Sequence, residues 1–158
     1  MSPQEIHDNL KAKFGDAILE AKLDALQPWI RVDDHRIKEI CLFLHDEPTF
    51  QFDFLMCLSG IDYNNGTLGA VYHLSSMSHK HKIVLKATCP KDNPRIQSVS
   101  SVWGTANWHE REAYDMYGIV FDEHPDLRRI LCPDDYPGFP LRKDFKVPEF
   151  YNGMKVPY

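Results

Sequence analysis

FDFLMCLSGIDY, residues 52–63, and LGAVYHLS, residues 68–75, are two apolar runs that flank a turn, and they decide the fold. Asn64-Asn65-Gly66 lies between the runs, and an Asn-Gly pair accepts the positive φ angles that a tight hairpin turn requires. A third strand-like run, residues 80–88, follows the polar turn Ser75-Ser76-Met77-Ser78. These segments predict a hairpin that continues into a third strand.

The chain begins with a well-marked helix start. Ser2 and Glu5 form a Ser-x-x-Glu capping box around Pro3, a residue that suits the first helical position. Apolar residues then recur at every fourth position, namely Ile6, Leu10 and Phe14. Gly15 follows, and glycine readily adopts the left-handed conformation that ends a helix. We therefore expect one helix between Ser2 and Gly15.

Two strands and a second helix are expected between this helix and the hairpin. The strand-like runs are residues 17–21 and 28–32. Asp33 or Asp34 caps the second helix, and Pro48 closes it. Its apolar face has the i, i+3, i+4, i+7 spacing, at Ile37, Ile40, Cys41 and Leu44. The order helix–strand–strand–helix–strand–strand–strand predicts an α+β, two-layer α/β fold in which helices cover one face of a mixed sheet.

Two short helices are predicted after the third strand. The first starts at the cap Asn93, with Pro94 at its first position. Its apolar residues are Ile96, Val99 and Trp103. The second begins near Asn107, has Glu110 as a candidate capping-box residue and ends at Gly118.

The composition changes beyond these helices. Six of the eleven prolines lie in the last 34 residues, at Pro125, Pro133, Pro137, Pro140, Pro148 and Pro157. Six aromatic residues accompany them: Tyr136, Phe139, Phe145, Phe150, Tyr151 and Tyr158. Proline removes backbone donors, so we expect an extended segment whose rings cover an apolar surface of this domain or of a neighbour. The expected division is a globular domain, residues 1–120, and an extended docking segment, residues 121–158.

Charge and hydropathy argue against several classes of function. A net charge of −5 and a pI near 5.9 disfavour a nucleic-acid-binding protein and a polybasic membrane anchor. The longest apolar run, Phe54 to Leu58, is far below the ~20 residues that span a bilayer, and the N-terminus lacks the features of a signal peptide. Scattered cysteines at 41, 57, 89 and 132 are typical of reduced, cytoplasmic thiols. We therefore expect any membrane contact to be made through a partner.

His73, His79 and His81 are the best candidates for metal ligands. A zinc site requires closely spaced ligands on a rigid turn and a further Cys or carboxylate nearby. The run 79–82, HKHK, instead alternates like the solvated start of a strand. The glycines form neither a dinucleotide fingerprint nor a phosphate loop, and no nucleophile elbow is present. We expect no catalytic, cofactor-binding or metal-ligating residue in this chain.

The densest group of charged residues lies between Glu110 and Arg129. On a helix, Arg111 and Glu112 are both neighbours of Asp115, and the two carboxylates require cations nearby. One interpretation is an ion-pair lattice that holds the tail, made of Glu110, Arg111, Glu112, Asp115, Arg128 and Arg129. The other is a free-standing acid–base enzyme, with Glu112, Asp115 and His124 as its titrating groups. We favour the lattice, because ion-pair networks perturb carboxylates as readily as active sites do.

These same residues carry a family resemblance. A spaced signature is met at Glu110-Arg111-Glu112, Asp115-Met116-Tyr117, His124, Arg128, Ile130 and Leu131. The block PDDYPGFPLRKDF, residues 133–145, follows it and contains Phe139, Pro140, Leu141, Arg142, Lys143 and Asp144. Over residues 103–145 the chain closely resembles the C subunit of respiratory complex I, the NADH–quinone oxidoreductase. The order of helices and strands upstream is compatible with this family.

The resemblance implies a hydrophilic subunit of a proton-translocating complex that supports electron transfer from NADH to quinone and binds no cofactor itself. Iron–sulfur clusters, FMN and quinone are then expected on other subunits. The D subunit would be the main partner along residues 139–150, with the iron–sulfur subunits B and I nearby, on the cytoplasmic side of a bacterial inner membrane. An alternative is the equivalent subunit of a membrane-bound nickel–iron hydrogenase or of a ferredoxin-fed complex.

Overall fold

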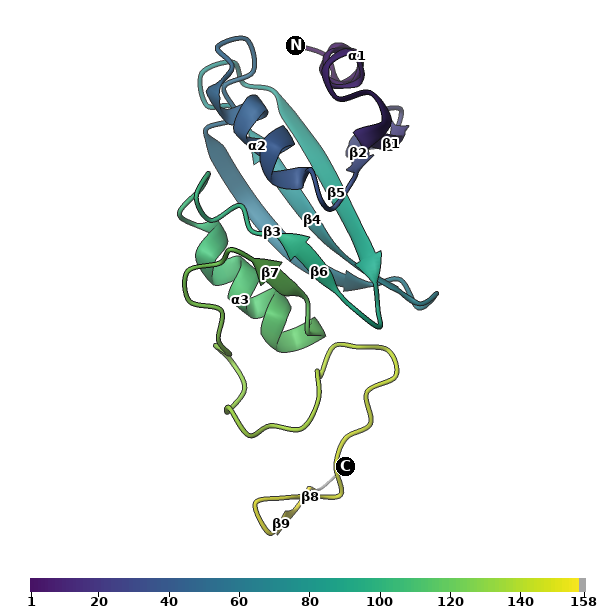
Figure 1. Cartoon of the computed structure of the whole chain (residues 1–158), viewed down its shortest axis with the longest axis vertical. Coiled ribbons are helices and arrows are strands. Elements are labelled where there is room, and N and C mark those ends of the chain that lie inside the picture. Colours follow the sequence, from purple (N-terminus) through teal and green to yellow (C-terminus); the bar gives the residue numbers. More distant parts are fainter. Residues whose placement is uncertain (157–158) are drawn as a thin grey trace.

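The computed structural model describes residues 1–156, and its largest element is a five-stranded mixed sheet (Figure 1). Its strands are β1 (Ile18–Lys22), β2 (Trp29–Val32), β3 (Phe54–Asp62), β4 (Thr67–Ser75) and β5 (Lys82–Pro90). They lie in the order β1-β2-β5-β4-β3, and neighbouring strands are antiparallel except for the parallel pair β2 and β5. The predicted α+β class with a mixed sheet is confirmed.

Helices pack against this sheet and close the core. They are α1 (Pro3–Phe14), the 3-10 turn η1 (Gly15–Ala17), α2 (Ile37–Asp46) and α3 (Ala106–Tyr117). In Figure 1, α2 lies over the sheet and α3 lies beside β3. The core combines residues of helices and strands that are fully buried, among them Ile6, Leu10, Ile37, Ile40, Leu44, Leu68, Tyr72 and Leu85. Burial of these side chains is the main favourable term in the folding of the domain.

The predicted start and end of α1 are confirmed. The Ser2 hydroxyl accepts a hydrogen bond from the Glu5 backbone N–H at 3.2 Å, and the Glu5 carboxylate accepts one from the Ser2 N–H at 2.7 Å. Gly15, with φ +53°, follows the last helical residue. The hairpin between β3 and β4 is confirmed too, because Asn64 and Gly66 adopt the positive φ angles of +58° and +84°.

The cap expected for α2 is wrong. The Asp33 carboxylate instead accepts a hydrogen bond from the His35 N–H at 2.8 Å, in a turn that precedes α2. Arg36 occupies the cap position instead, and neither it nor Asp34 provides a side-chain cap. An aspartate before a helix favours a local turn as readily as a cap, and here the turn is formed.

The short helix predicted over 93–103 is also wrong. The segment forms β6 (Arg95–Gln97), which pairs in parallel with β7 (Val120–Asp122) beyond α3. Ile96 in β6 and Phe121 in β7 are both buried in the core. Helical spacing of a few apolar residues cannot reveal a strand whose partner lies about twenty-five residues further along the chain. The expected domain boundary at 120 and 121 thus falls inside β7.

Gly60 lets α3 approach the sheet closely. A Cβ atom at Gly60 would lie 2.5 Å from Cδ2 of Tyr117 and 3.3 Å from the Ala113 Cβ. We predict that Gly60→Ala destabilises the chain by about 1–3 kcal/mol, because α3 must shift away from β3. Gly104→Ala is the control, since no atom lies within 4 Å of a Cβ there, and it should change stability by less than ~0.5 kcal/mol. Urea unfolding measures both variants, and equal effects would contradict the close approach.

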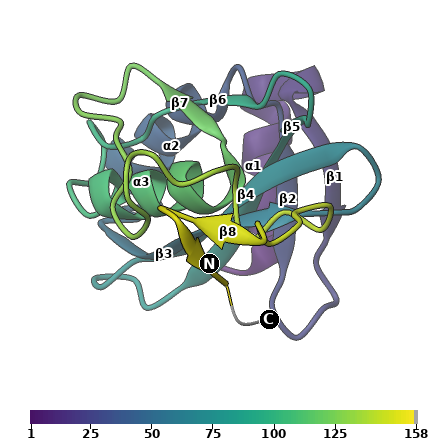
Figure 2. The same ribbon diagram turned by 90° about the horizontal axis from the view of Figure 1, so that it is seen from below.

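The tail leaves β7 and remains mostly irregular. It passes below the domain in Figure 1, and Figure 2, the view from that side, shows it crossing the end of the molecule that carries α3. A small hairpin of β8 (Phe150–Tyr151) and β9 (Met154–Lys155) lies near its end. Pro157 and Tyr158, noted in the sequence as part of this segment, lie outside the described residues.

Candidate functional site

Asp115, on the inner face of α3, is the central residue where the tail begins. Its carboxylate has no solvent exposure and accepts hydrogen bonds from the N–H groups of Ile130, Leu131 and Cys132 at 3.0, 2.7 and 2.8 Å. The Arg129 guanidinium donates to the second carboxylate oxygen at 3.0 Å. Burial alone would raise the pKa of Asp115, but these four hydrogen bonds outweigh it and hold the pKa below its usual value. The carboxylate therefore stays charged and fixes the chain direction after β7.

Arg129 extends this anchor into the tail. Its guanidinium also donates to the carbonyl oxygens of Tyr136 at 3.2 Å and Gly138 at 3.1 Å. The same group lies 5.4 Å from the centre of the Phe139 ring, within the range of a cation–π contact. One arginine therefore joins α3 to two separate parts of the tail. The flat, forked donor set of arginine suits this bridging role better than a lysine would.

Arg111 contacts the tail backbone rather than its side chains. Its guanidinium donates to the carbonyl oxygens of Arg128 and Arg129, both at 3.2 Å, and packs over Trp108. Arg111 is a neighbour of Asp115 by helical spacing, but its guanidinium donates to the tail, and Arg129 is the cation that pairs with Asp115. Arg128 in turn pairs with Asp126 at 2.9 Å on the surface, where both side chains are exposed.

The C-terminal end of α3 is capped by residues of the block 133–145 of the tail. The Leu141 N–H donates to the Met116 carbonyl at 3.1 Å, and the Arg142 guanidinium donates to the Tyr117 carbonyl at 2.6 Å. The last carbonyls of a helix lack intrahelical partners and carry partial negative charge, so an arginine is favourable there.

Gly118 makes room for the ring of Phe139, which belongs to the block of residues 133–145. Its backbone is left-handed, with φ +74°, and a Cβ at this position would lie 2.5 Å from the Phe139 ring. Phe139 is also covered by Arg142, whose guanidinium lies 4.6 Å from the ring centre. Pro140, half-buried, leads from this ring to Leu141.

A second buried carboxylate, Asp62 at the end of β3, holds the tail further along. It accepts hydrogen bonds from the Lys143 N–H at 2.9 Å, from the Asn64 N–H at 2.8 Å and from the Lys91 ammonium at 3.1 Å. Lys91 also pairs with Asp144 at 2.9 Å. Burial acts to raise the pKa of Asp62, yet these contacts lower it to about 2. Asp62 was not among the predicted site residues, although an acid at an inward-facing position of an alternating strand is a signal for such a role.

The far part of the tail has a small aromatic cluster of its own. The Tyr136 ring is stacked with the Phe145 ring, with 6.2 Å between the ring centres. The centres of the Tyr136 and Tyr151 rings lie 5.5 Å apart. The Tyr151 hydroxyl donates to the Asp135 carboxylate at 2.8 Å. Large apolar side chains around this cluster remain exposed, namely Leu131, Leu141, Val147, Phe150 and Met154. An exposed apolar set on an ordered segment is typical of a protein–protein contact.

Glu110 and His124 form hydrogen bonds that hold the loops around α3 rather than the part of the tail that binds Asp115. Glu110 is fully buried and accepts hydrogen bonds from the Val99 N–H at 2.7 Å and the Ser98 hydroxyl at 2.6 Å, so its expected capping-box role is wrong. His124 accepts a hydrogen bond from the Asp126 N–H, which leaves its other ring nitrogen to donate to the Asn107 carbonyl at 3.1 Å. Both residues hold loops around α3.

Glu110 predicts a pH dependence of stability. Burial raises its pKa from 4.5 to about 7, against the lowering effect of the two hydrogen bonds. Folding therefore favours the protonated carboxyl, so its contribution to stability is full below pH 4.5 and is lost as the pH rises through 7. Glu110→Gln, which stays neutral, should show a smaller fall in unfolding free energy across this range. Urea unfolding at a series of pH values compares the two proteins, and parallel curves would contradict the assignment.

The acid–base alternative finds little support in this geometry. Asp115 is saturated by four donors, and His124 is engaged on both ring nitrogens. Glu112 is exposed and lines a hollow of about 210 Å³ with His109, to which neither of the other two residues contributes. Three groups that do not share a cavity have no common place to act on a substrate.

The histidines considered for metal binding have separate environments. His81 is buried and its ring contacts the Phe50 carbonyl at 2.7 Å, so the expectation of a solvated position is wrong for it. His79 contacts the Pro48 carbonyl at 3.0 Å, and His73 lies on the outer face of the sheet. Within residues 1–156, no three His, Cys, Asp or Glu side chains are grouped so that they could hold a metal ion.

Comparison with known proteins places the chain in a family. The model described as "Respiratory-chain NADH dehydrogenase, 30 Kd subunit" matches residues 30–151, more than three quarters of the chain. This chain belongs to that family. The matched range includes α3, the buried carboxylates Asp62 and Asp115 and the tail as far as Tyr151. The resemblance to the C subunit of complex I that the signature indicated is confirmed.

Relatives of this 30-kDa subunit family cover most of the chain. The C subunit of NADH-quinone oxidoreductase from Chloroherpeton thalassium is 52% identical over 94% of the chain, and that from Chlorobium phaeobacteroides is 49% identical over 96%. The chain spans 63% of the first protein's length and 93% of the second's. The C subunit of F(420)H(2) dehydrogenase from Methanosarcina mazei is 43% identical over 92% of the chain and 93% of its own length.

Two solved structures share the fold. A trypsin-resistant fragment of Nqo5 has a TM-score of 0.65 at 27% identity, covering 80% of this chain and the whole fragment. A chain of the membrane-bound sulfane sulfur reductase, an archaeal respiratory membrane complex, has a TM-score of 0.73 at 23% identity, covering 90% of this chain and 85% of that one. Among residues 1–156, no helix has the length and apolar character needed to cross a membrane.

Proposed function

We propose that this chain is a structural subunit of a proton-translocating NADH–quinone oxidoreductase and supports electron transfer from NADH to quinone without a cofactor of its own. The observation that carries the proposal is the tail, which two buried carboxylates fasten to the domain while its apolar side chains face outward. Family membership and the relatives named as C subunits support the kind of assembly. In this account the chain shapes and steadies neighbours that carry the electrons.

The tail acts as the docking segment. Residues 1–120 are the globular domain and residues 121–158 the docking segment, which Arg111, Asp115 and Arg129 hold against α3. Of the other residues expected in the lattice, Glu110 and His124 hold loops around α3, Arg128 pairs with Asp126, and the Glu112 side chain has no partner among residues 1–156. The segment from Phe139 to Phe150 lies along a neighbouring subunit. Exposed Leu141, Val147 and Phe150 support this placement. The trypsin resistance of only a fragment of the related Nqo5 agrees with a division into a domain and a more accessible part.

The proposed partners are those that the resemblance to the C subunit implies. The D subunit is the main neighbour of the tail, and the iron–sulfur subunits B and I lie nearby. Iron–sulfur clusters, FMN and quinone are bound by other subunits. The chain is peripheral, on the cytoplasmic side of a bacterial inner membrane, and is held there through the complex. The names of its relatives support membership of an NADH-quinone oxidoreductase complex, in which this arrangement is proposed.

A second candidate differs in the electron donor. The 43% identical relative from Methanosarcina mazei is named a subunit of F(420)H(2) dehydrogenase, so a chain of this sequence type serves complexes with another donor. The equivalent subunit of a membrane-bound nickel–iron hydrogenase or a ferredoxin-fed complex belongs to the same group of candidates. None of the contacts at α3 depends on the donor.

Purification of the tagged full chain from its native membranes in mild detergent tests the proposal. We expect subunits D, B and I and a flavin-containing NADH module to be recovered with it and identified by mass. Recovery of the same quinone-side subunits with a different electron-input module would favour the second candidate. A chain recovered alone would contradict both.

A further inference from the structure

The outer face of the sheet, opposite the helices, collects positive charge. Residues paired across neighbouring strands lie on the same face, so the strand register identifies its members. Glu20 pairs with Arg31 and Lys22 with Trp29, while Arg31 and Trp29 in turn align with Lys86 and Val84. Lys82 lies two residues before Val84 on the same strand, and therefore on this face. The cations of the face are Lys22, Arg31, Lys82 and Lys86, and its acid is Glu20.

This face therefore has the opposite charge to the whole chain. Four cations and one acid give it a net charge of +3, whereas the chain carries −5. Glu20 is already paired with Arg31 at 3.0 Å, and the Lys86 ammonium lies 3.9 Å from the centre of the Trp29 ring. Lys82 is exposed and, among residues 1–156, its ammonium group makes no hydrogen bond or ion pair. Such segregation of charge on a protein surface selects partners of opposite sign.

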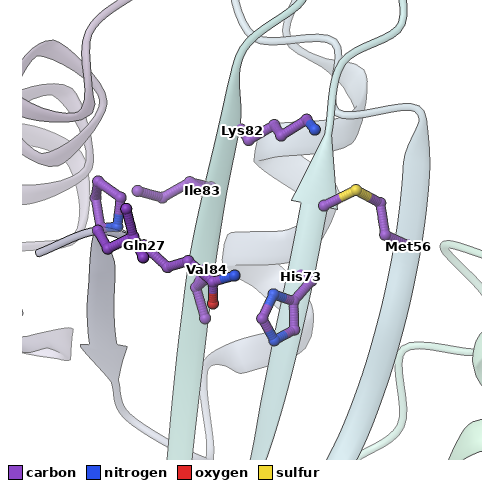
Figure 3. A pocket seen from close by; sticks show the side chains of 8 residues that line it. Gln27, Met56, His73, Lys82, Ile83 and Val84 are labelled. Carbon is purple, nitrogen blue, oxygen red and sulfur yellow. The ribbon is translucent and has the colours of Figure 1, made fainter.

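An apolar hollow lies within the positive face. Figure 3 shows Met56, His73 and Val84 on adjacent strands with Lys82 above them, in front of the sheet, and the helix ribbon behind it. The hollow measures about 140 Å³ and is lined mainly by apolar side chains, including Met56, Val84 and the fully exposed Leu26 of the neighbouring loop. Its size suits one aliphatic or aromatic side chain. An apolar depression of this kind, with the Lys82 ammonium at its border, is typical of the anchor position of an interface.

We propose that this outer face docks onto a second member of the assembly, one that inserts an apolar side chain into the hollow and surrounds it with carboxylates. The inference rests on the proposed function, because it requires the chain to be part of a complex. A second copy of this chain is disfavoured in a symmetric contact, since a symmetric pair would bring two faces of +3 together. None of the residues of this face belongs to the tail or to its anchors. The chain therefore has two independent contact surfaces.

Lysine reactivity in the intact complex tests this contact. The purified complex and the isolated full chain are treated with an amine-reactive reagent, and modified lysines are identified by mass. Lys82 and Lys22 should be protected at least about tenfold in the complex, as expected for side chains moved into a protein interface. Lys13, exposed on α1, should react equally in both and is the control. Zero-length coupling with a carbodiimide should join Lys82 to an Asp or Glu of another subunit.

Charge reversal provides the second measurement. Lys82→Glu should weaken association of the chain with the complex at least about tenfold, whereas Lys13→Glu, with the same change in charge, should leave it unchanged. Equal reactivity of Lys82 in complex and free chain would overturn the inference while leaving the proposed function intact. Coupling of Lys82 to a second copy, or protection only on anionic lipid vesicles, would overturn it as well. Absence of the chain from the complex would overturn both.

Discussion

A chain that ends at Cys132 is expected to fold but to be lost from the complex. The truncation keeps Asp115 with its three backbone donors and Arg129, so the anchor at the end of β7 survives. It removes the outward-facing apolar side chains from Leu141 onward, which supply the contact with the partner. Without them the interface loses its buried apolar centre, where most binding energy resides. Co-purification from native membranes should fall to background.

A second truncation is the control for this experiment. A chain that ends at Tyr151 keeps the segment from Phe139 to Phe150 and the Tyr151 contact with Asp135. It should be recovered with the same partners as the full chain. Circular dichroism and urea unfolding verify that both shortened chains are folded. Recovery of partner subunits with the Cys132 truncation at the level of the full chain would contradict the docking role of the tail.

Asp115→Asn is expected to destabilise the chain by about 3–5 kcal/mol, the largest effect of any single substitution considered. The amide has one acceptor oxygen and an NH₂ group that would face donors, either the Arg129 guanidinium or the N–H groups of residues 130–132. Arg129 would also be left half-buried without its counterion. Because the pKa of Asp115 is held low, its contribution to stability is present above the unfolded pKa and is lost as the pH falls through the folded one.

Glu112→Gln is the matched control on the same helix. Glu112 is exposed and, within residues 1–156, its side chain has no hydrogen bond or ion pair, so its substitution should change the unfolding free energy by less than ~0.5 kcal/mol. Urea unfolding at neutral pH compares the two variants with the parent chain. A loss below ~1 kcal/mol for Asp115→Asn would show that the buried carboxylate does not organise the tail.

Local signals in the sequence predicted much of the domain correctly. The capping box at Ser2 and Glu5, the Asn-Gly turn and the glycine after α3 each act within a few residues, so their geometry follows from short-range chemistry. The family signature identified α3 and the start of the tail as the relevant region before any contact was known.

Most of the missed features depend on partners far along the chain, whereas the predicted cap of α2 failed because Asp33 forms a local turn. β6 resembled a helix because its pairing strand follows α3. Helical spacing makes Arg111 a neighbour of Asp115, yet its guanidinium donates to two carbonyls of the tail that no spacing rule includes. Asp62 was included in the strand-like run 52–63 without a role, because its role depends on Lys143, eighty-one positions later. Tertiary contacts of this kind override local preference and are not encoded in a short window.

Amide hydrogen exchange in the free chain tests the central claim most directly: that buried carboxylates order the tail on α3 before any partner binds. The amides of Ile130, Leu131 and Cys132 donate to Asp115, and they should exchange as slowly as residues of β4. In Asp115→Asn they should lose this protection at a denaturant concentration where β4 keeps it. Exchange of these three amides at the rate of an unstructured peptide in the parent chain would contradict the account.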